Sequence, residues 1–168
     1  MTVQNLDAAC AKLGADLGSS GNKDTESRIT KALGVLEEQG IYAMFLYLVA
    51  REDSKFVRDL IAFMEEWCGL QGGKQRYESW TKAKKKLDEV EKRAKSPQDR
   101  HRKEVKQAVE TARKDEKASR EAFFQTLCSY ADNADNVDKL LFARDLLHRA
   151  LVYARYHAKA AQIGGDGT

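Results

Sequence analysis

Proline is nearly absent from this chain, which has Pro97 alone among its 168 residues. Folds built from β-strands need many turns rich in glycine and proline, so this scarcity favours long helices. Long apolar runs are also missing, because the most apolar segment, Ile41 to Ala50, has ten residues. A membrane-spanning helix needs about twenty. We therefore expect an all-α protein that crosses no membrane.

Cysteine is scarce as well, and Cys10, Cys68 and Cys128 lie far apart along the chain. A sparse, odd-numbered set of this kind does not make a disulfide framework. Each cysteine lies in an apolar, helix-like context, which predicts the role of a small buried side chain. The sequence also shows no signal peptide, so a reducing cytoplasm is the expected compartment.

The residue patterns of catalytic and metal sites are missing too. A metal site needs several converging ligands, but His101, His148 and His157 neither neighbour a cysteine nor share a helix face. No nucleophile elbow is present, and the glycines of 69–73 lack the lysine-serine ending of a phosphate-binding loop. We therefore predict no catalytic residues, no metal and no cofactor, and we do not expect an enzyme.

Helical periodicity is the dominant pattern of the chain. Apolar residues recur at steps of three and four, and glycines or Asp/Asn clusters separate the periodic segments. The pattern predicts helices over residues 6–17, 24–39, 41–50, 56–67, 74–95, 97–131 and 137–161. The segment 41–50 is apolar on all sides, which is typical of a buried central helix, although a buried strand has the same signature.

Charge divides the predicted helices into two groups. Residues 74–120 hold 17 basic and 9 acidic residues, whereas residues 1–73 hold 7 and 11. The middle segment also has few large apolar side chains, which predicts a thin antiparallel hairpin that turns at Ser96-Pro97 and projects from a compact bundle. We expect residues 1–73 and 121–163 in the bundle, followed by a disordered tail at 164–168.

A cluster of basic residues on the predicted hairpin is the first candidate binding surface. Its members are Arg76, Lys82, Lys84, Lys85 and Lys86. Tyr77 and Trp80 lie among them, and basic residues interleaved with aromatic ones suit a nucleic-acid backbone with stacked bases. An ordinary lysine-rich, solvent-exposed helix has the same composition, so both interpretations stay open.

The last predicted helix carries the second candidate surface. Its basic members are Arg144, His148, Arg155 and Lys159. They fall within about 60° of one another on a helical projection, and such a stripe can follow phosphates without reading bases. Tyr156 at the margin could stack on a base; a solvated helix flank is the alternative. On a different face, the small side chains of Ala150, Ala154 and Ala158 predict the close approach of another helix.

Two segments resemble a known family. The segment Leu36-Glu-Glu-Gln-Gly-Ile-Tyr-Ala-Met-Phe-Leu-Tyr-Leu48 is similar to the helix–glycine–apolar-helix pattern of the small subunit of type III CRISPR effector complexes, especially the Cmr type. Residues 140–160 resemble that family's C-terminal helix, through Arg144, Tyr153, Arg155, His157 and Ala158. The charged hairpin of 74–120 departs from the more compact bundle of that family.

The resemblance implies a non-catalytic subunit that stacks in several copies along a ribonucleoprotein filament. It implies that Arg144, Arg155 and Lys159 contact the guide–target duplex. We therefore expect a subunit of an RNA-guided antiviral complex that binds the backbone of RNA or single-stranded DNA without sequence specificity. The alternative is a coiled-coil adaptor or scaffold whose hairpin arm docks a protein partner.

Overall fold

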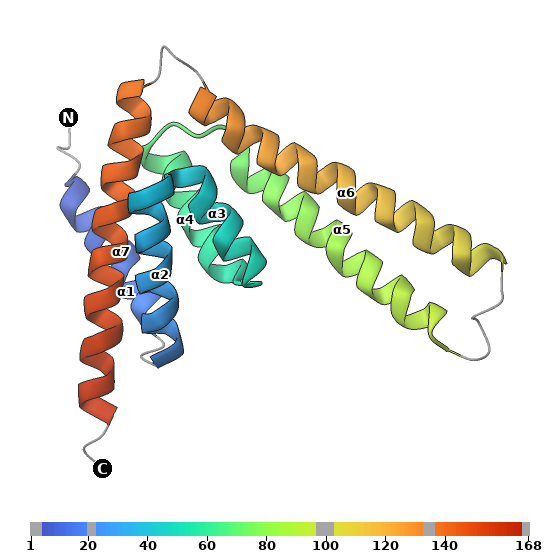
Figure 1. Cartoon of the computed structure of the whole chain (residues 1–168), viewed down its shortest axis with the longest axis horizontal. Coiled ribbons are helices and arrows are strands. Elements are labelled where there is room, and N and C mark those ends of the chain that lie inside the picture. The colour runs from blue at the N-terminus through green and yellow to red at the C-terminus, as the bar shows by residue number, and fades with distance from the viewer. Residues whose placement is uncertain (1–4, 20–22, 97–102, 133–136, 166–168) are drawn as a thin grey trace. The chain divides into compact units, whose positions relative to one another are not determined.

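A computed structural model of the chain describes residues 5–19, 23–96, 103–132 and 137–165 (Figure 1). These residues form helices and short connections without a strand, which confirms the all-α prediction and the helix over 41–50. The helices are α1 (Leu6–Gly18), α2 (Lys23–Gln39), α3 (Ile41–Ala50), α4 (Ser54–Trp67), α5 (Gly73–Ala94), α6 (Lys103–Asp132) and α7 (Val137–Gly165). None of the helices in this described part is long and apolar enough for a membrane crossing. Pro97, His101 and residues 166–168 of the predicted tail lie outside the described residues. Gly164 and Gly165, which the prediction assigned to the disordered tail, belong to α7, so the prediction is wrong for these two residues.

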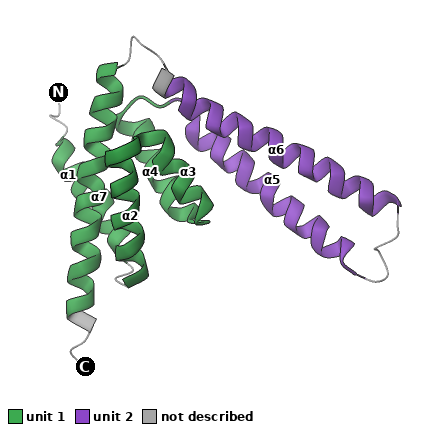
Figure 2. Ribbon diagram, in the orientation of Figure 1, with its two compact units in different colours: residues 1–70, 131–168 green, residues 71–130 purple. Residues whose placement is uncertain are grey.

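The chain divides into two compact units, which Figure 2 shows in different colours. The first unit, the bundle, comprises residues 1–70 and 131–168 and contains α1 to α4 and α7. The second unit, the hairpin, comprises residues 71–130 and contains α5 and nearly all of α6. Residues 121–130, which we had expected in the bundle, fall within the hairpin. The reason is that aromatic side chains of α6 pack against α5.

The bundle is organised around α7, which packs against both α1 and α2. The side of α7 that meets them is made of small and medium apolar side chains, and its fully buried members include Ala143, Leu147, Ala150, Ala154 and Ala158. The close approach predicted from the small residues is confirmed, because Gly14 and Gly18 of α1 lie directly against the α7 backbone. Small side chains on both helices therefore set the short distance between them.

α3 differs from its prediction as a buried central helix. One of its sides is buried, through Ile41, Met44, Phe45 and Leu48. The opposite side is half-buried or exposed, and its members are Tyr42, Ala43, Leu46, Val49 and Ala50. α3 packs against α2 and α4, and no helix among the described residues of the bundle covers its other side. The expected central position is therefore wrong, and α3 is an apolar helix at the surface of the bundle.

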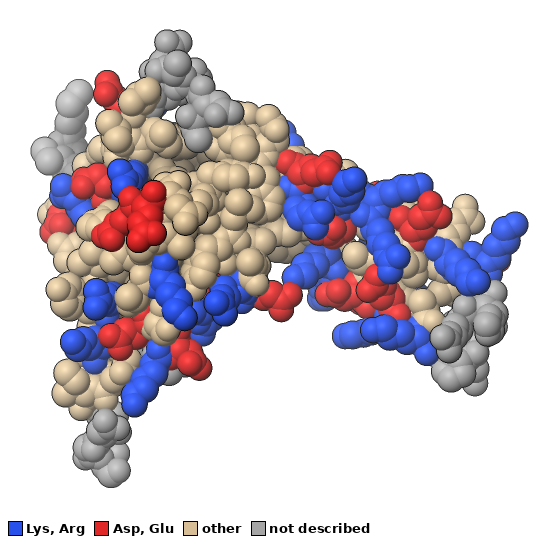
Figure 3. Space-filling view, in the orientation of Figure 1, with Lys and Arg blue, Asp and Glu red and all other residues tan. Residues whose placement is uncertain are grey.

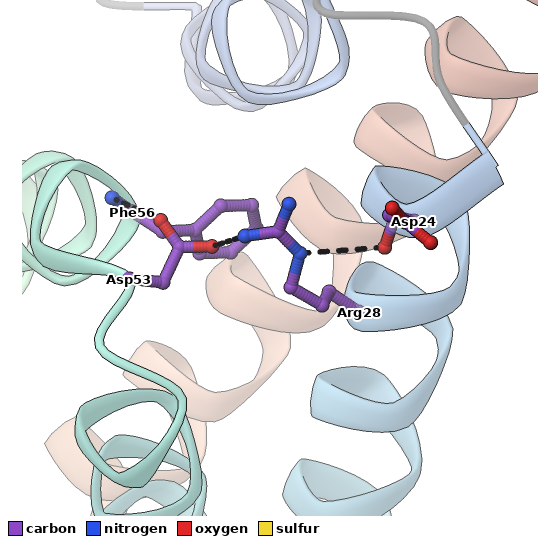
Figure 4. Close-up of polar contacts among 4 residues, drawn as sticks. All are labelled: Asp24, Arg28, Asp53 and Phe56. Atoms are coloured by element: carbon purple, nitrogen blue, oxygen red, sulfur yellow. Dashed lines mark hydrogen bonds and ion pairs between the residues drawn. The ribbon is translucent and has the colours of Figure 1, made fainter.

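A polar contact joins α2 to the start of α4 (Figure 4). The Arg28 guanidinium forms an ion pair of 2.9 Å with Asp53 and donates from Nε to the Asp24 carbonyl at 3.3 Å. The other carboxylate oxygen of Asp53 accepts from the Phe56 backbone N–H at 3.4 Å, which caps α4. One aspartate thus begins α4 and attaches it to α2.

The hairpin has an aromatic core of its own. Tyr77 and Trp80 of α5 are buried, as is Phe123 of α6. The Trp80 and Phe123 rings stack with centroids 5.6 Å apart, and the Tyr77 and Phe123 centroids are 5.2 Å apart. The indole Nε1 of Trp80 donates to Glu116 Oε1 at 2.7 Å, so the polar atom of this ring also has a partner on α6. These contacts hold α5 and α6 together.

Candidate nucleic-acid interface

The basic residues of the stripe predicted on α7 fall into two pairs, of which one contacts α2 and the other does not. Arg144 lies at the C-terminal end of α2, where Nη2 donates to the Glu37 carbonyl at 2.6 Å and Nε donates to the Leu36 carbonyl at 3.4 Å. The last carbonyls of a helix have no partners within the helix and carry the negative end of its dipole. The guanidinium of Arg144 therefore fastens α2 to α7.

His148 contributes to the same attachment. Its Nε2 lies 2.8 Å from Glu37 Oε1, which makes an ion pair whenever the imidazole is protonated. Arg144 and His148 thus face α2, although the sequence pattern had placed them on a nucleic-acid surface. The spacing along α7 could not reveal this, because the partner comes from a helix about a hundred residues earlier.

The other half of the stripe is available to a ligand. Arg155 and Lys159 are exposed one helical turn apart, and neither makes a hydrogen bond or ion pair with a described residue. Tyr156 is 66 % exposed, which is the second-highest value among the exposed large apolar and aromatic side chains of the described bundle. α7 therefore presents two free cations and one aromatic ring.

All five predicted basic residues of α5 are exposed, but they do not share one face. On a helical projection Lys82, Lys85 and Lys86 lie within about 100° of one another, whereas Lys84 and Arg76 point elsewhere. Arg76 lines a separate hollow of about 610 Å³ between α5 and α6, together with Ser79 and other polar or small residues. Only part of the predicted cluster therefore forms a continuous surface.

That surface continues further along α5 than the cluster suggested. Lys92 and Arg93 follow Lys85 and Lys86 by seven residues each, which returns them to the same side of the helix. We call the five side chains the basic face of α5: Lys82, Lys85, Lys86, Lys92 and Arg93. All five are exposed and make no hydrogen bond or ion pair with a described residue. The heptad spacing is visible in the sequence, and it is the signal that places Lys92 and Arg93 on the same face as Lys85 and Lys86.

The basic face also contains two carboxylates, from Glu78 and Glu89, both without an ion pair in the described part of the chain. The face therefore keeps a clear excess of positive charge. The hairpin as a whole holds 17 basic and 10 acidic residues, a net charge of +7. In Figure 3 lysine and arginine side chains extend along both hairpin helices, with acidic groups between them.

The cations in the middle of α6 are largely neutralised. Lys114 pairs with Glu110 at 3.1 Å, and Arg113 reaches across to Glu91 of α5 at 2.8 Å. Two further pairs lie nearer the aromatic core, Arg120 with Glu116 and Lys117 with Glu121. Exposed pairs of this kind contribute little stability, but they offset positive charge. The uncompensated charge of the described hairpin is therefore concentrated on α5.

The aromatic residues within the predicted cluster do not face a ligand. Tyr77 is 5 % exposed and Trp80 is 7 % exposed, because both rings form the hairpin core. The hypothesis that bases stack on them is therefore wrong. Helical periodicity explains the burial, since these two residues are three apart and belong to the side of α5 that meets α6.

The described residues contain no group of three or more His, Cys, Asp or Glu side chains that could hold a metal ion. Burial raises the pKa of the Cys68 thiol to about 12, and burial likewise raises the pKa of the Cys10 thiol. Both thiols are therefore protonated at neutral pH, in which form they are poor nucleophiles. Cys10 also donates a hydrogen bond to the Leu146 carbonyl, which gives it a packing role.

Comparison with known proteins adds no relative, because no family model, no curated protein and no solved structure matches this chain. The resemblance to type III small subunits therefore rests on the two sequence segments alone. The structural support for a function comes from the exposed cations of the described residues.

Proposed function

We propose that this chain is a non-catalytic helical subunit that binds the phosphate backbone of nucleic acid, chiefly through the basic face of α5. The observation that carries the proposal is the set of five exposed cations without a described intramolecular partner. Like charges held on one helix face repel one another, and a polyanion relieves this repulsion while it releases its own counterions. The cations in the middle of α6 have less repulsion for a polyanion to relieve, because acidic partners already offset their charges.

The chemistry of the face supports binding without sequence specificity. Four of its five cations are lysines, whose compact ammonium groups contact phosphates as point charges. Phosphate contacts position a nucleic acid but do not distinguish bases. Arg155 and Lys159 of α7 provide a second, smaller set of contacts of the same kind.

The resemblance extends the proposal to an RNA-guided antiviral complex in the cytoplasm, in which several copies of the chain would assemble with other subunits. Arg155 and Lys159, which the resemblance implies as contacts to the guide–target duplex, are exposed and would make these contacts. Arg144 supports the bundle instead, since it is bound to the end of α2.

A charge-reversal experiment tests the proposal. The variant Lys82→Glu, Lys85→Glu, Lys86→Glu should weaken binding of a fluorescently labelled RNA and lower the steepness of its salt dependence by about two to three. The matched control, Lys114→Glu, Lys117→Glu, Arg120→Glu, changes the net charge equally but reverses cations that are already paired. Equal losses of affinity in both variants would show that net charge, rather than the basic face of α5, governs binding.

A protein adaptor remains the second candidate, because one observation favours it. Leu87 and Val90 of α5, and Val105 and Val109 of α6, are only half-buried. Half-exposed apolar side chains of this kind can accept a partner helix. Size measurement before and after nuclease treatment separates the candidates: a large species that survives nuclease supports the adaptor, and one that disappears supports the nucleic-acid subunit.

A further inference from the structure

The hollow that Arg76 lines, between α5 and α6, lies entirely within the hairpin. Its volume of about 610 Å³ falls within the range of about 300–1,000 Å³ that is typical of sites for small ligands. Small residues leave this space open, and they are Gly72, Ala118 and Ala122. The remaining lining is polar and consists of Gln71, Gln75, Arg76, Ser79 and Ser119. The hollow can therefore form hydrogen bonds with a ligand, but it offers no aromatic ring for stacking.

Arg76 is the only charged residue among the described residues that line the hollow. It is exposed and makes no hydrogen bond or ion pair with a described residue. Glu121, which is next to the lining residue Ala122, pairs with Lys117 at 3.9 Å. A guanidinium can hold a phosphate through two parallel N–H donors. The charge of the hollow therefore selects an anion.

The border of the hollow carries both signs of charge. Glu78 of α5 and Asp115 of α6 are its nearest acidic residues without an ion pair in the described hairpin. Lys82 and Lys86 follow Ser79 by about one and two helical turns, and both are likewise without an ion pair there. Two carboxylates are thus offset by two ammonium groups, and the positive charge of Arg76 remains in excess.

The hollow continues the basic face of α5 toward the start of that helix. Gln75 and Lys82 are seven residues apart, as are Ser79 and Lys86. Residues at this spacing return to the same side of a helix. The distance along the helix axis from Gln75 to Lys86 is about 16 Å. A strand that follows the basic face toward the start of α5 therefore reaches the hollow.

We propose that the hollow takes one unpaired nucleotide of the strand that the basic face of α5 binds, with its phosphate on the Arg76 guanidinium. The inference rests on the proposed function and narrows it to single strands. The base and sugar occupy the space beside Ala118 and Ala122, within reach of the Ser119 hydroxyl. Unpaired bases can turn out of a strand freely, whereas a base in a duplex must first give up its pairing and stacking.

The same chemistry could come from a free mononucleotide, but the hollow suits a nucleotide within a strand. It provides one cation and no aromatic ring, which makes it a weak site by itself. The rest of a strand on the basic face holds the nucleotide at a high effective concentration. Adenosine 5′-monophosphate should therefore displace bound RNA only at millimolar concentration. Displacement at micromolar concentration would assign the hollow to a free nucleotide and overturn the proposal.

Fluorescence anisotropy with a labelled single-stranded RNA and an RNA duplex of equal length tests the proposal. The wild type should prefer the single strand. Arg76→Met should weaken binding of the single strand about tenfold, the usual effect of losing a charged hydrogen bond, and that of the duplex less than about twofold. Lys92→Met is the matched control, because it removes one charge from the basic face outside the hollow. It should weaken binding of both RNAs equally.

A variant that fills the hollow without a change of charge tests its volume. Ala118 is exposed, so Ala118→Leu should leave the hairpin folded, as circular dichroism verifies, and should weaken binding of the single strand alone. Equal effects of Arg76→Met on both RNAs, an unaffected Ala118→Leu, or a wild type without preference for the single strand overturns the proposal and leaves RNA binding by the basic face intact. A wild type that binds neither RNA overturns the proposed function as well.

Discussion

Gly14 of α1 lies so close to Ala154 of α7 that a Cβ on the glycine would come within 2.8 Å of the Ala154 backbone nitrogen. The same added atom would lie 2.5 Å from Cβ of Tyr153. One turn later, a Cβ on Gly18 would lie 2.5 Å from the Ala154 carbonyl oxygen. Two glycines of α1 thus allow its backbone to rest on the backbone of α7, which cannot move aside as a flexible side chain can.

Gly14→Ala should therefore destabilise the bundle by about 1–3 kcal/mol, because the new methyl group forces α1 away from α7. Gly34→Ala is the control within α2, since no atom lies within 4 Å of a Cβ at that position. It should stabilise the protein by about 0.4–1 kcal/mol, through the lower entropy of the unfolded chain. Urea unfolding followed by circular dichroism measures both; a stabilising Gly14→Ala would contradict the close contact.

Arg144→Met should lower the free energy of unfolding by about 1–2 kcal/mol, because the carbonyls of Leu36 and Glu37 lose a charged donor. The aliphatic part of the side chain is retained. Arg155→Met, on the exposed half of the same helix, should change stability by no more than about 0.5 kcal/mol. Amide hydrogen exchange at the end of α2 should increase in the first variant alone, and similar exchange in both would contradict the structural role of Arg144.

Trp80→Phe should destabilise the hairpin by about 1 kcal/mol, because Glu116 loses the indole donor while most of the ring packing remains. Trp80→Ala should cost about 3–5 kcal/mol, since it empties the aromatic core. Neither effect comes from a contact with nucleic acid. The affinity of Trp80→Phe for RNA should therefore equal that of the wild type in fluorescence anisotropy, and a selective loss of affinity would indicate that the ring reaches the ligand.

Stability should decline in alkaline solution because of the buried thiols. The folded pKa of Cys68 is about 12, whereas an unfolded cysteine has a pKa of about 8.5. Below pH 8 the thiol is protonated in both states and has no effect on the pH dependence. Between about pH 8.5 and 12 the unfolded state releases this proton and the folded state keeps it, so the free energy of unfolding falls as pH rises.

Cys10 and Tyr153 act in the same direction, since the pKa of each is raised in the folded state, by burial for Cys10 and by the hydrogen bond to Asp7 for Tyr153. Urea midpoints at pH 7.5 and pH 10 measure the decline, and Cys68→Ala should show a smaller one. An identical decline in the variant would show that Cys68 does not contribute.

Helical periodicity determined much of the fold from the sequence. Apolar residues at steps of three and four, with glycine punctuation, predict helices that agree with α1 to α7 to within a few residues. The predicted start of the sixth helix, at residue 97, lies outside the described residues. The run Ile41 to Ala50 was identified as a helix because no partner strand was present, and the Ala150, Ala154 and Ala158 spacing indicated a close helix contact. These features depend on neighbours along the chain, whose spacing the sequence states directly.

Contacts between distant residues were decided by the tertiary structure alone. The sequence could not show that Arg144 and His148 bind the end of α2, that Trp80 is enclosed by Phe123, or that α3 is covered on one side only. A charged residue looks the same in the sequence whether its partner is solvent or a carbonyl a hundred residues away. The positive charge of this chain was therefore evident from the sequence, but which cations remain free for a ligand was decided by the packing of its helices.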